Sequence, residues 1–310
     1  MKILLLAVLL DLVFGDPPNR WHPVAWIGHL VTAGRALAPR GSTTDLALYG
    51  TFLLLAVVSA AVVGTLIFRH VIGLLPSPLA LLLEAWLLKC AFSPRGLARA
   101  VELVRGHLVA GDLDGARRQL AAHLVSRPTG ELDRGAVGSA AVESLAENLT
   151  DGWVAPLCFF LVGGLPAAWA YRAVNTADAM IGYREGELEY LGRATAQVDD
   201  ALNFVPARLA AWALVAGAWL AHQSVAGARL ILARDGRLTT SPNAGQTMAA
   251  MAGALGVTLE KPGEYRLGDG PQPDLEAMDR ALRLNRWASA LSLAAAVMIL
   301  ALIHRGPSVL

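Results

Sequence analysis

Residues 46–68, LALYGTFLLLAVVSAAVVGTLIF, decide the class of fold because they form 23 consecutive positions without a charged side chain. A helix needs roughly 20 mostly apolar residues to cross the hydrocarbon core of a membrane. The stretch therefore predicts a membrane-spanning helix. Further apolar stretches cover residues 152–171, 209–228 and 287–303, and a shorter one, residues 71–83, is interrupted by two prolines. The sequence predicts an all-α polytopic integral membrane protein with four to five transmembrane helices.

The composition supports this class and excludes several others. The chain of 310 residues is 55% hydrophobic and 16% charged, whereas a soluble domain carries about 25% charged residues. The 26 basic and 25 acidic residues give a net charge of +1, which lacks the basic excess of a nucleic-acid binder. Two cysteines without a Cys-x-x-Cys pair exclude a disulfide framework or a zinc ribbon. We expect a single membrane-embedded domain over residues 1–310.

The positions of arginine predict how the chain is oriented in the membrane. Residues 89–151 and 229–286 each contain seven arginines, whereas residues 172–202 contain three. Since cytoplasmic loops are enriched in Lys and Arg, we expect the two long segments in the cytoplasm and a location in the cell (inner) membrane. Alternation of the spans then places residues 172–202 outside. A re-entrant hairpin at Gly163-Gly164-Leu165-Pro166 would change that side.

The segments between the apolar stretches show weaker patterns. Residues 94–125 have apolar side chains at helical spacing on both sides of Gly111-Asp112, which predicts two amphipathic helices joined by a turn. Residues 259–275 are rich in Gly, Pro and charge, and predict an extended loop or a short hairpin. The apolar N-terminus has no small-residue cleavage site, so we expect a retained short helix rather than a signal peptide.

Two polar clusters precede the middle of the chain. Asp16 and His22 lie in a Pro-rich turn after the first apolar helix. Glu143, Glu147 and Asp151 are four residues apart, so a helix would align three carboxylates on one face. Like charges at this spacing repel, and Mg²⁺ or a cationic substrate would relieve the repulsion. The alternative is a solvated helix face that ends in an N-cap.

Further polar clusters follow the middle apolar stretches. Arg172, Asn175 and Asp178 are three residues apart, and ionisable residues at a membrane segment indicate a functional site. The alternative is an ion pair between Arg172 and Asp178 that holds helices together. The remaining polar positions are Asp199, Asp200, Asn203 and Arg208 at the entrance to the next span, and Asn243 within Ser241-Pro242-Asn243-Ala244-Gly245.

In this order, the clusters resemble the motifs of one known family. They are Gly15-Asp16-Pro17 with His22-Pro23, Glu143-Ser-Leu-Ala-Glu147-Asn148 with Asp151-Gly152, Asn175-Thr-Ala-Asp178-Ala-Met-Ile-Gly182-Tyr183, Asp199-Asp200 to Pro206-Ala-Arg208, and Ser241 to Gly245. Together they resemble the CobD/CbiB family, the membrane proteins of cobalamin biosynthesis called adenosylcobinamide-phosphate synthases. The resemblance covers nearly the whole chain.

The resemblance implies a ligase that forms an amide. Such an enzyme attaches (R)-1-amino-2-propanol, or its O-phosphate, to the free propionate of adenosylcobyric acid and gives adenosylcobinamide or its phosphate. It implies ATP as co-substrate and Mg²⁺, with the corrinoid as substrate and no tightly bound cofactor. Membrane lipid and other cobalamin-assembly membrane proteins are the further partners it implies. The chain has no Walker A motif, so a nucleotide would bind at an unfamiliar site.

With this reaction in view, the polar residues receive expected roles. Carboxylates serve as metal ligands and bases, and arginines hold phosphoryl oxygens. We expect catalytic roles for Glu143, Glu147, Asp178, Asp199 and Asp200, and metal binding by Glu143, Glu147 and Asp151. We expect substrate binding by Asp16, His22, Asn148, Arg172, Asn175, Tyr183, Asn203, Arg208 and Asn243.

Two other functions fit parts of the pattern. A small-molecule transporter also places polar residues at broken helices, but two cytoplasmic segments of roughly 60 residues each and few spans argue against it. A non-catalytic scaffold or signalling protein, like the AmpE-type relatives, is the other alternative. The intact set of motifs favours the enzyme.

Overall fold

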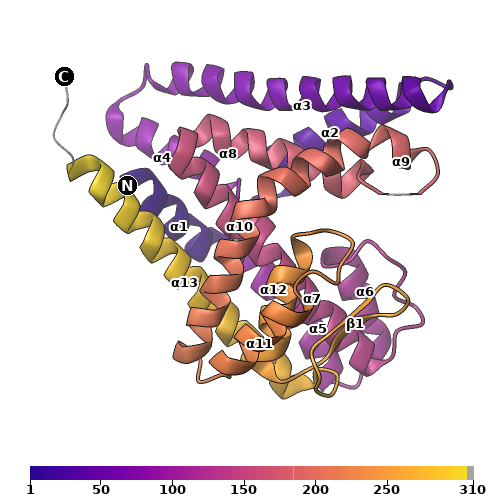
Figure 1. The fold of residues 1–310 in the computed structure, drawn as a ribbon. Helices are drawn as coiled ribbons and strands as arrows, with labels where there is room; N and C mark the ends of the chain where they lie inside the picture. Colours follow the sequence, from indigo (N-terminus) through magenta and orange to yellow (C-terminus); the bar gives the residue numbers. More distant parts are fainter. Residues whose placement is uncertain (184, 306–310) are drawn as a thin grey trace. The chain divides into compact units, whose positions relative to one another are not determined.

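The computed structural model describes residues 1–183 and 185–305, and most of them are helical (Figure 1). The chain forms two compact units. Unit 1 contains Met1–Ser93, Ala155–Leu202 and the chain from Ala296 onward, and unit 2 contains Pro94–Val154 and Asn203–Ala295. Each unit combines segments that are far apart in the sequence, so no single cut in the chain separates them.

The helices of the two units follow one another along the chain. Those that begin before residue 93 are α1 (Lys2–Phe14), η1 (Asn19–Trp21), α2 (Pro23–Ala36), α3 (Thr43–Ile72) and α4 (Ser77–Lys89). The middle of the chain forms α5 (Pro94–Val109), α6 (Leu113–His123), α7 (Arg134–Leu149), η2 (Thr150–Val154), α8 (Ala155–Ile181) and α9 (Leu188–Leu191). The last part forms α10 (Arg193–Leu220), α11 (Val225–Asp235), α12 (Ala244–Leu255), β1 (Leu259–Lys261), β2 (Tyr265–Leu267) and α13 (Leu275–Arg305).

Four helical segments of the described chain are long and apolar enough to cross a membrane, which confirms the all-α polytopic class. They are Thr43–Ile72, Arg134–Ile181, Arg193–Leu220 and Leu275–Ile303. The short apolar stretch at 71–83 does not form a fifth span. It is divided between the end of α3 and the 13-residue helix α4, which reaches only about 20 Å at 1.5 Å per residue.

The predicted span over residues 209–228 had the wrong boundaries. The helix begins earlier, at Arg193, and ends at Leu220. His222 then adopts a positive φ of 54°, which a continuing helix does not allow. Ser224 starts the next helix, because its side chain accepts a hydrogen bond from the backbone N–H of Gly227 at 2.9 Å.

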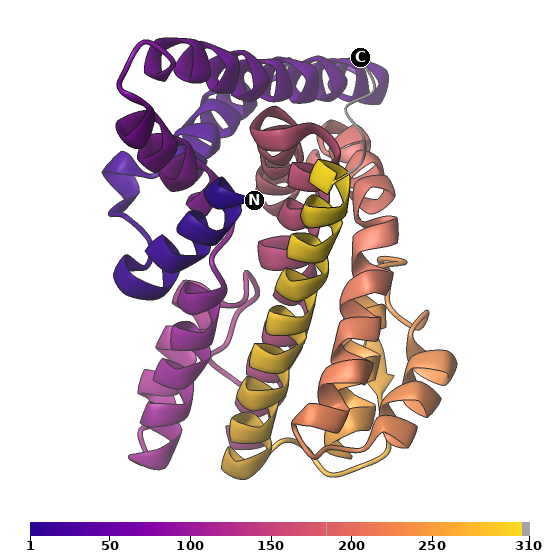
Figure 2. The same cartoon turned by 90° about the vertical axis from the view of Figure 1, so that its left-hand side faces the viewer.

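Unit 1 is held together by helix packing around α8. The helices α2 and α3 both pack against α8, and α1 packs against α4 (Figure 2). Leu4 and Ala7 of α1 are fully buried. Large apolar side chains of α3, including Phe52 and Leu55, remain exposed, as expected for a helix that faces lipid.

The predicted break in the apolar stretch 152–171 is confirmed. Gly163 and Gly164 have non-helical backbone angles, and Gly164 has a φ of 64°, which favours glycine because it has no Cβ. Figure 1 shows the chain change direction there, and the part of α8 after the break runs beside α3. The side of the membrane on which residues 172–202 lie stays a prediction.

Unit 2 contains the amphipathic helices that the sequence predicts. Asp112 caps α6, because its carboxylate accepts a hydrogen bond from the N–H of Gly115 at 2.8 Å. The 259–275 segment contains a short hairpin in which β1 and β2 pair antiparallel. The helices α11 and α12 lie side by side, and close approach of Gly227 to the backbone of Gly253 permits this contact.

Candidate functional site

A chain of polar side chains connects α8 to α10 within unit 1. An Arg172 Nη1 donates a hydrogen bond to the Oδ1 of Asn175 at 3.0 Å. The Asn175 amide then donates to the Oδ1 of Asp199 at 3.4 Å. Two clusters that lie 24 residues apart in the sequence are thus brought together. We call Arg172, Asn175 and Asp199 the α8–α10 network.

The α8–α10 network is buried at Asp199 and partly accessible to solvent at its other two residues. Asp199 is 9% exposed, whereas Arg172 and Asn175 are half-buried. The Asn175 amide donates to the Asp199 carboxylate, and a carboxylate can accept several hydrogen bonds or a proton. A guanidinium and a carboxylate on one frame can bind an anionic group and an amine at the same time. The alternative of an ion pair between Arg172 and Asp178 stays a prediction.

Two glycines, Gly182 just after α8 and Gly192 just before α10, allow these helices to approach. A Cβ on Gly192 would lie 1.8 Å from the carbonyl oxygen of Ile181, and 3.0 Å from the Cα of Gly182. A side chain at Gly192 would therefore separate α8 from the start of α10. The carboxylate of Asp178 folds over Gly182, where a Cβ would lie 1.9 Å from its Oδ1. These contacts place the acidic start of α10 beside the polar face of α8.

Other predicted residues of this region lie around the network. Asp178 and Asp200 are half-buried. Tyr183 is exposed, and its hydroxyl donates to the carbonyl of Ala179 at 2.9 Å. Asn203, farther along α10 and in unit 2, is buried. The roles of these four residues in catalysis and substrate binding stay predictions.

Glu143 lies in a buried network of unit 2 and not on a solvated helix face. Glu143 is 5% exposed. Its carboxylate accepts hydrogen bonds from the Ser139 hydroxyl at 2.6 Å and from the Tyr265 hydroxyl at 2.8 Å. Arg127 lies 3.7 Å away. Ser139 also accepts from the backbone N–H of Glu260 at 3.0 Å. Glu143 thus ties the β1–β2 hairpin to α7, and loss of activity on its substitution would not by itself indicate catalysis.

Burial and the neighbouring carboxylates act on Tyr265, which lies outside the membrane segments. Burial and the charge of Glu143 raise the pKa of the Tyr265 phenol above its usual range. The phenol therefore stays protonated at neutral pH and donates its proton to Glu143. The contact is a structural hydrogen bond between a neutral donor and a charged acceptor.

The predicted metal ligands do not converge in unit 2. Glu147 and Asp151 are half-buried, and Asp151 lies in the π-helical turn η2 beyond the end of α7. This turn changes the angular position of Asp151 relative to the α-helical stripe. Among residues 1–183 and 185–305, no group of three or more His, Cys, Asp or Glu side chains is placed to hold a metal ion. Glu143 accepts hydrogen bonds from two hydroxyl groups, and metal binding by Glu143, Glu147 and Asp151 stays a prediction.

Asn148 and the pair formed by Arg208 and Asn243 complete the predicted positions in unit 2. The Asn148 amide donates to the backbone carbonyl of Ser144 at 2.9 Å and is thereby turned back onto its own helix. An Arg208 Nη1 donates to the Oδ1 of the buried Asn243 at 3.2 Å. The structure thus joins two further sequence clusters, those of residues 199–208 and 241–245.

A buried lysine in unit 1 is a residue that sequence reasoning missed. Lys89, 2% exposed, lies 3.3 Å from the carboxylate of the fully buried Asp11 and also forms an ion pair with Asp16. Asp16 accepts hydrogen bonds from Lys89 and Ser93, and His22 Nε2 lies 3.6 Å away. We call Lys89, Asp11, Asp16 and His22 the Lys89 cluster.

This cluster gives structural roles to two predicted substrate-binding residues. His22 accepts a hydrogen bond from the N–H of Val24 at 3.2 Å and caps α2. Burial raises the pKa of the Asp16 carboxyl, but hydrogen bonds from His22, Lys89 and Ser93 together hold it well below its usual range. Asp16 is therefore ionised at neutral pH and balances Lys89. Their predicted contacts with substrate stay predictions.

Comparisons with known proteins support the resemblance that the motifs carry. The profile of the CobD/Cbib protein family matches residues 4–294. A "Cobalamin biosynthesis protein CobD" of Dehalococcoides mccartyi is 42% identical over 273 residues, which cover 88% of each chain. A "Probable cobalamin biosynthesis protein CobD" of Methanothermobacter thermautotrophicus is 42% identical and covers 87% of each chain. A "Cobalamin biosynthesis protein CobD" of Klebsiella pneumoniae is 37% identical over 93% of each chain. No solved structure matches this chain.

Proposed function

We propose a reaction from one premise: the chain belongs to the CobD/CbiB family of cobalamin biosynthesis proteins. It forms an amide between the free propionate of adenosylcobyric acid and (R)-1-amino-2-propanol or the O-phosphate of that amine. ATP activates the carboxylate. The observation that carries the proposal is the α8–α10 network, which holds a guanidinium and a carboxylate on one frame at the end of a membrane helix.

The chemistry of amide formation assigns roles to the network. A carboxylate is a poor acyl donor, and transfer of the terminal phosphoryl group of ATP to it gives an acyl phosphate. The amine then attacks the acyl carbon. The new C–N bond forms as the C–O bond to phosphate breaks, and phosphate leaves with the electron pair of that bond. The attacking amine loses a proton, and Asp199 accepts it as general base.

Arg172 and Asn175 act beside this base. The Arg172 guanidinium binds phosphate or carboxylate oxygens through parallel N–H groups. Asn175 is a positioning residue, because its amide lies between Arg172 and the Asp199 carboxylate. Asp178 of α8 and Asp200 of α10 are half-buried and lie on the same two helices as the network. They supply further negative charge for a cationic amine. Mg²⁺ and ATP remain part of the proposal, and no step is assigned to a metal ligand because no group of three or more ligand side chains within the described residues is placed to hold a metal ion.

The proposed surroundings follow from the substrates. ATP and the corrinoid are soluble in the cytoplasm, so the arginine-rich segments face that side of the inner membrane. The hydrophobic exposed face of α3 contacts lipid. Other membrane proteins that act on the amide product are the partners that this placement favours.

The proposal predicts the step at which cobalamin synthesis stops when the gene is deleted. The deletion strain should fail to grow on supplied cobyric acid under conditions that require cobalamin, and supplied cobinamide should restore growth. The reason is that cobinamide already carries the amide that this protein would form. Growth of the deletion strain on cobyric acid, with no second copy of the gene present, would contradict the proposal.

A further inference from the structure

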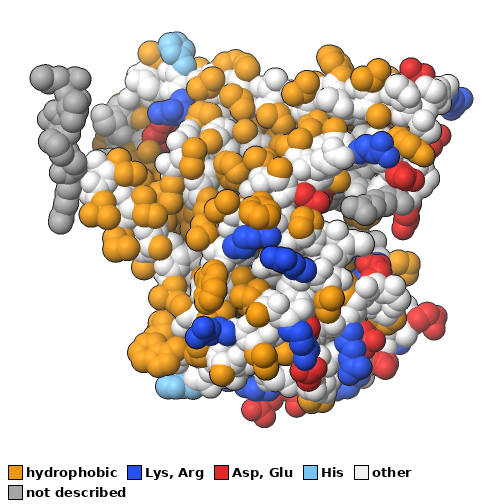
Figure 3. Space-filling model, viewed as in Figure 1, with side chains coloured by type: hydrophobic (Ala, Val, Ile, Leu, Met, Phe, Trp, Pro, Cys, Tyr) orange, Lys and Arg blue, Asp and Glu red, His pale blue; other side chains and the backbone are white. Residues whose placement is uncertain are grey.

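A cavity in unit 2 is lined by arginines that form no ion pair with a carboxylate of the described residues. It has a volume of about 830 Å³, within the range of about 300–1,000 Å³ that is typical of small-molecule sites. Trp212 of α10, Arg229 of α11, Arg237 after α11 and Gln246 of α12 line it. We call these four residues the arginine pocket. Figure 3 shows Lys and Arg side chains on the face of the molecule that is turned to the viewer, among hydrophobic ones.

The two arginines of the arginine pocket differ from several other arginines of unit 2 in their pairing with carboxylates. Arg234, five residues after Arg229 in α11, forms ion pairs with Asp235 and Asp269, each at 2.6 Å. Arg105 and Arg286 are also paired with carboxylates. Within the described part of the chain, none of the ion pairs includes Arg229 or Arg237, and no acidic residue lines the cavity. The pocket therefore carries uncompensated positive charge.

A third arginine adds to this charge. Arg208 donates to the backbone carbonyl of Phe204 and to the amide oxygen of Asn243, both of which are neutral acceptors. Arg237 is close enough to act electrostatically on Arg208. Like charges near one another are unfavourable, and a bound anion would relieve their repulsion.

The remaining residues indicate what kind of anion fits. Guanidinium groups match phosphate oxygens through paired N–H donors. The Trp212 side chain is 56% exposed, so its ring is available for contact with an apolar or aromatic part of a ligand. The amide of Gln246 donates to the carbonyl of Gly236 at 2.6 Å, which leaves its oxygen as an acceptor. Because α10 is a candidate membrane span, the phosphate could belong to a lipid headgroup or to a soluble phosphorylated molecule.

We propose that the arginine pocket binds the phosphate groups of a phosphorylated ligand. This inference does not depend on the proposed ligase reaction, because it rests on charge and cavity in unit 2 alone. The α8–α10 network lies in unit 1, whereas the arginine pocket lies in unit 2.

Two binding experiments test the inference and distinguish the sources of phosphate. The full-length protein in neutral detergent is titrated with inorganic pyrophosphate by calorimetry, and native mass spectrometry measures retention of phosphatidylglycerol against phosphatidylcholine. The double substitution Arg229→Gln and Arg237→Gln should weaken binding by at least about tenfold, because it removes both paired donors and two charges. Rising salt should weaken the same binding in the unsubstituted protein.

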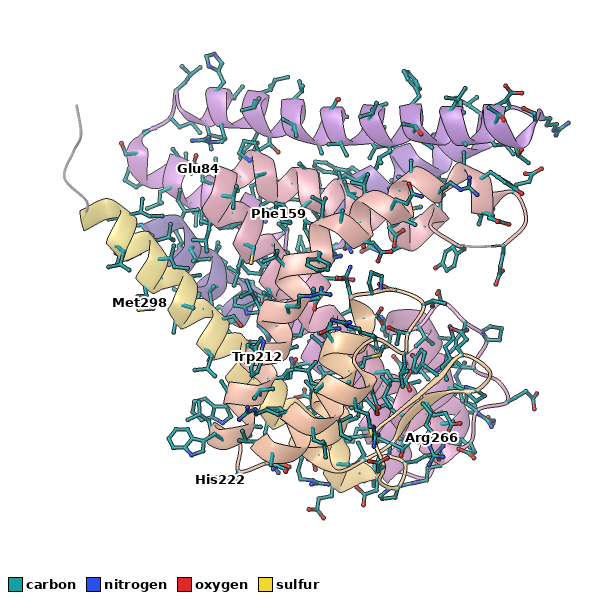
Figure 4. All side chains as sticks on the ribbon, in the orientation of Figure 1. Glu84, Phe159, Trp212, His222, Arg266 and Met298 are labelled. Atoms are coloured by element: carbon teal, nitrogen blue, oxygen red, sulfur yellow. The ribbon has the colours of Figure 1, made fainter. Side chains whose placement is uncertain are left out.

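The matched control is Arg266→Gln. Arg266 is exposed on the β1–β2 hairpin and lies well apart from Trp212 in Figure 4. The substitution Arg266→Gln removes one charge outside the pocket and should leave binding unchanged. Pyrophosphate binding identifies a soluble ligand, and selective retention of phosphatidylglycerol identifies a lipid headgroup. Binding in neither experiment, or binding that the double substitution does not weaken relative to Arg266→Gln, overturns the inference. Circular dichroism of the double variant confirms that a loss of binding is not a loss of fold.

Discussion

Asp199→Asn is expected to lower the rate of amide formation by about 10²–10⁴-fold, the usual contribution of a positioned general base. Asparagine has nearly the same shape as aspartate, and its side-chain oxygen can still accept the hydrogen bond from Asn175. It cannot accept the proton that the attacking amine releases. Turnover of the variant should therefore collapse while thermal unfolding in detergent changes little.

The pH dependence separates this role from a structural one. If Asp199 is the base, the acid limb of the wild-type profile of kcat against pH should be missing from the residual activity of Asp199→Asn. The control is Glu189→Gln on α9, which neutralises an exposed carboxylate in the same unit. Near-normal turnover in Asp199→Asn, or an unchanged acid limb, would assign the base to another carboxylate.

Lys89→Met is expected to lower the free energy of unfolding by about 3–5 kcal/mol, because it leaves a buried charge without its partner. Asp11 is fully buried and Lys89 lies 3.3 Å from its carboxylate. Methionine fills similar volume but supplies no charge or hydrogen-bond donor. Thermal unfolding of the full-length protein in detergent measures the loss.

Two variants check the origin of that loss. Lys261→Met removes a surface pair with Glu264, whose side chains are 32% and 43% exposed, and should cost under about 1 kcal/mol. The double variant Lys89→Met with Asp11→Leu removes both buried charges and should recover much of the stability. If Lys89→Met and Lys261→Met unfold at similar temperatures, the assigned role of the Lys89 cluster is contradicted.

The sequence predicts the helical elements well because their signals are local. The uncharged stretch within α3 and the Gly163-Gly164 break each depend on neighbouring residues, and both are present. The turn at Asp112 also depends on local capping chemistry. The end of α10 was placed too late, because the stretch stays free of charged side chains through residue 228 although the helix ends at Leu220.

The candidate site was harder to predict because it depends on contacts between distant segments. The α8–α10 network needs the approach of Gly182 and Gly192, which no periodicity reveals. The prediction that Glu143, Glu147 and Asp151 share one helix face assumed an unbroken α-helix. Asp151 instead lies in a π-helical turn. Glu143 received a functional role because its buried partner, Tyr265, lies more than a hundred residues away.

Lys89 illustrates a signal that could have been used. It is one of three lysines in the chain and ends an apolar helix. A lysine in such a position needs a carboxylate partner when it is buried. Asp11, which interrupts the apolar first helix, is the matching acidic residue. The pairing of two charges that each interrupt an apolar segment would have predicted the contact between α1 and α4.

The most direct test of the proposed function is product analysis with purified protein. The full-length chain in detergent is incubated with adenosylcobyric acid, Mg-ATP, and (R)-1-amino-2-propanol or its O-phosphate in parallel reactions. Mass spectrometry should detect a corrinoid heavier by one amine minus one water, formed together with ADP, and the more efficient amine identifies the substrate. Intact adenosylcobyric acid in both reactions, with folded protein and no ATP consumed, would contradict the assignment of this chain as the amide-forming ligase.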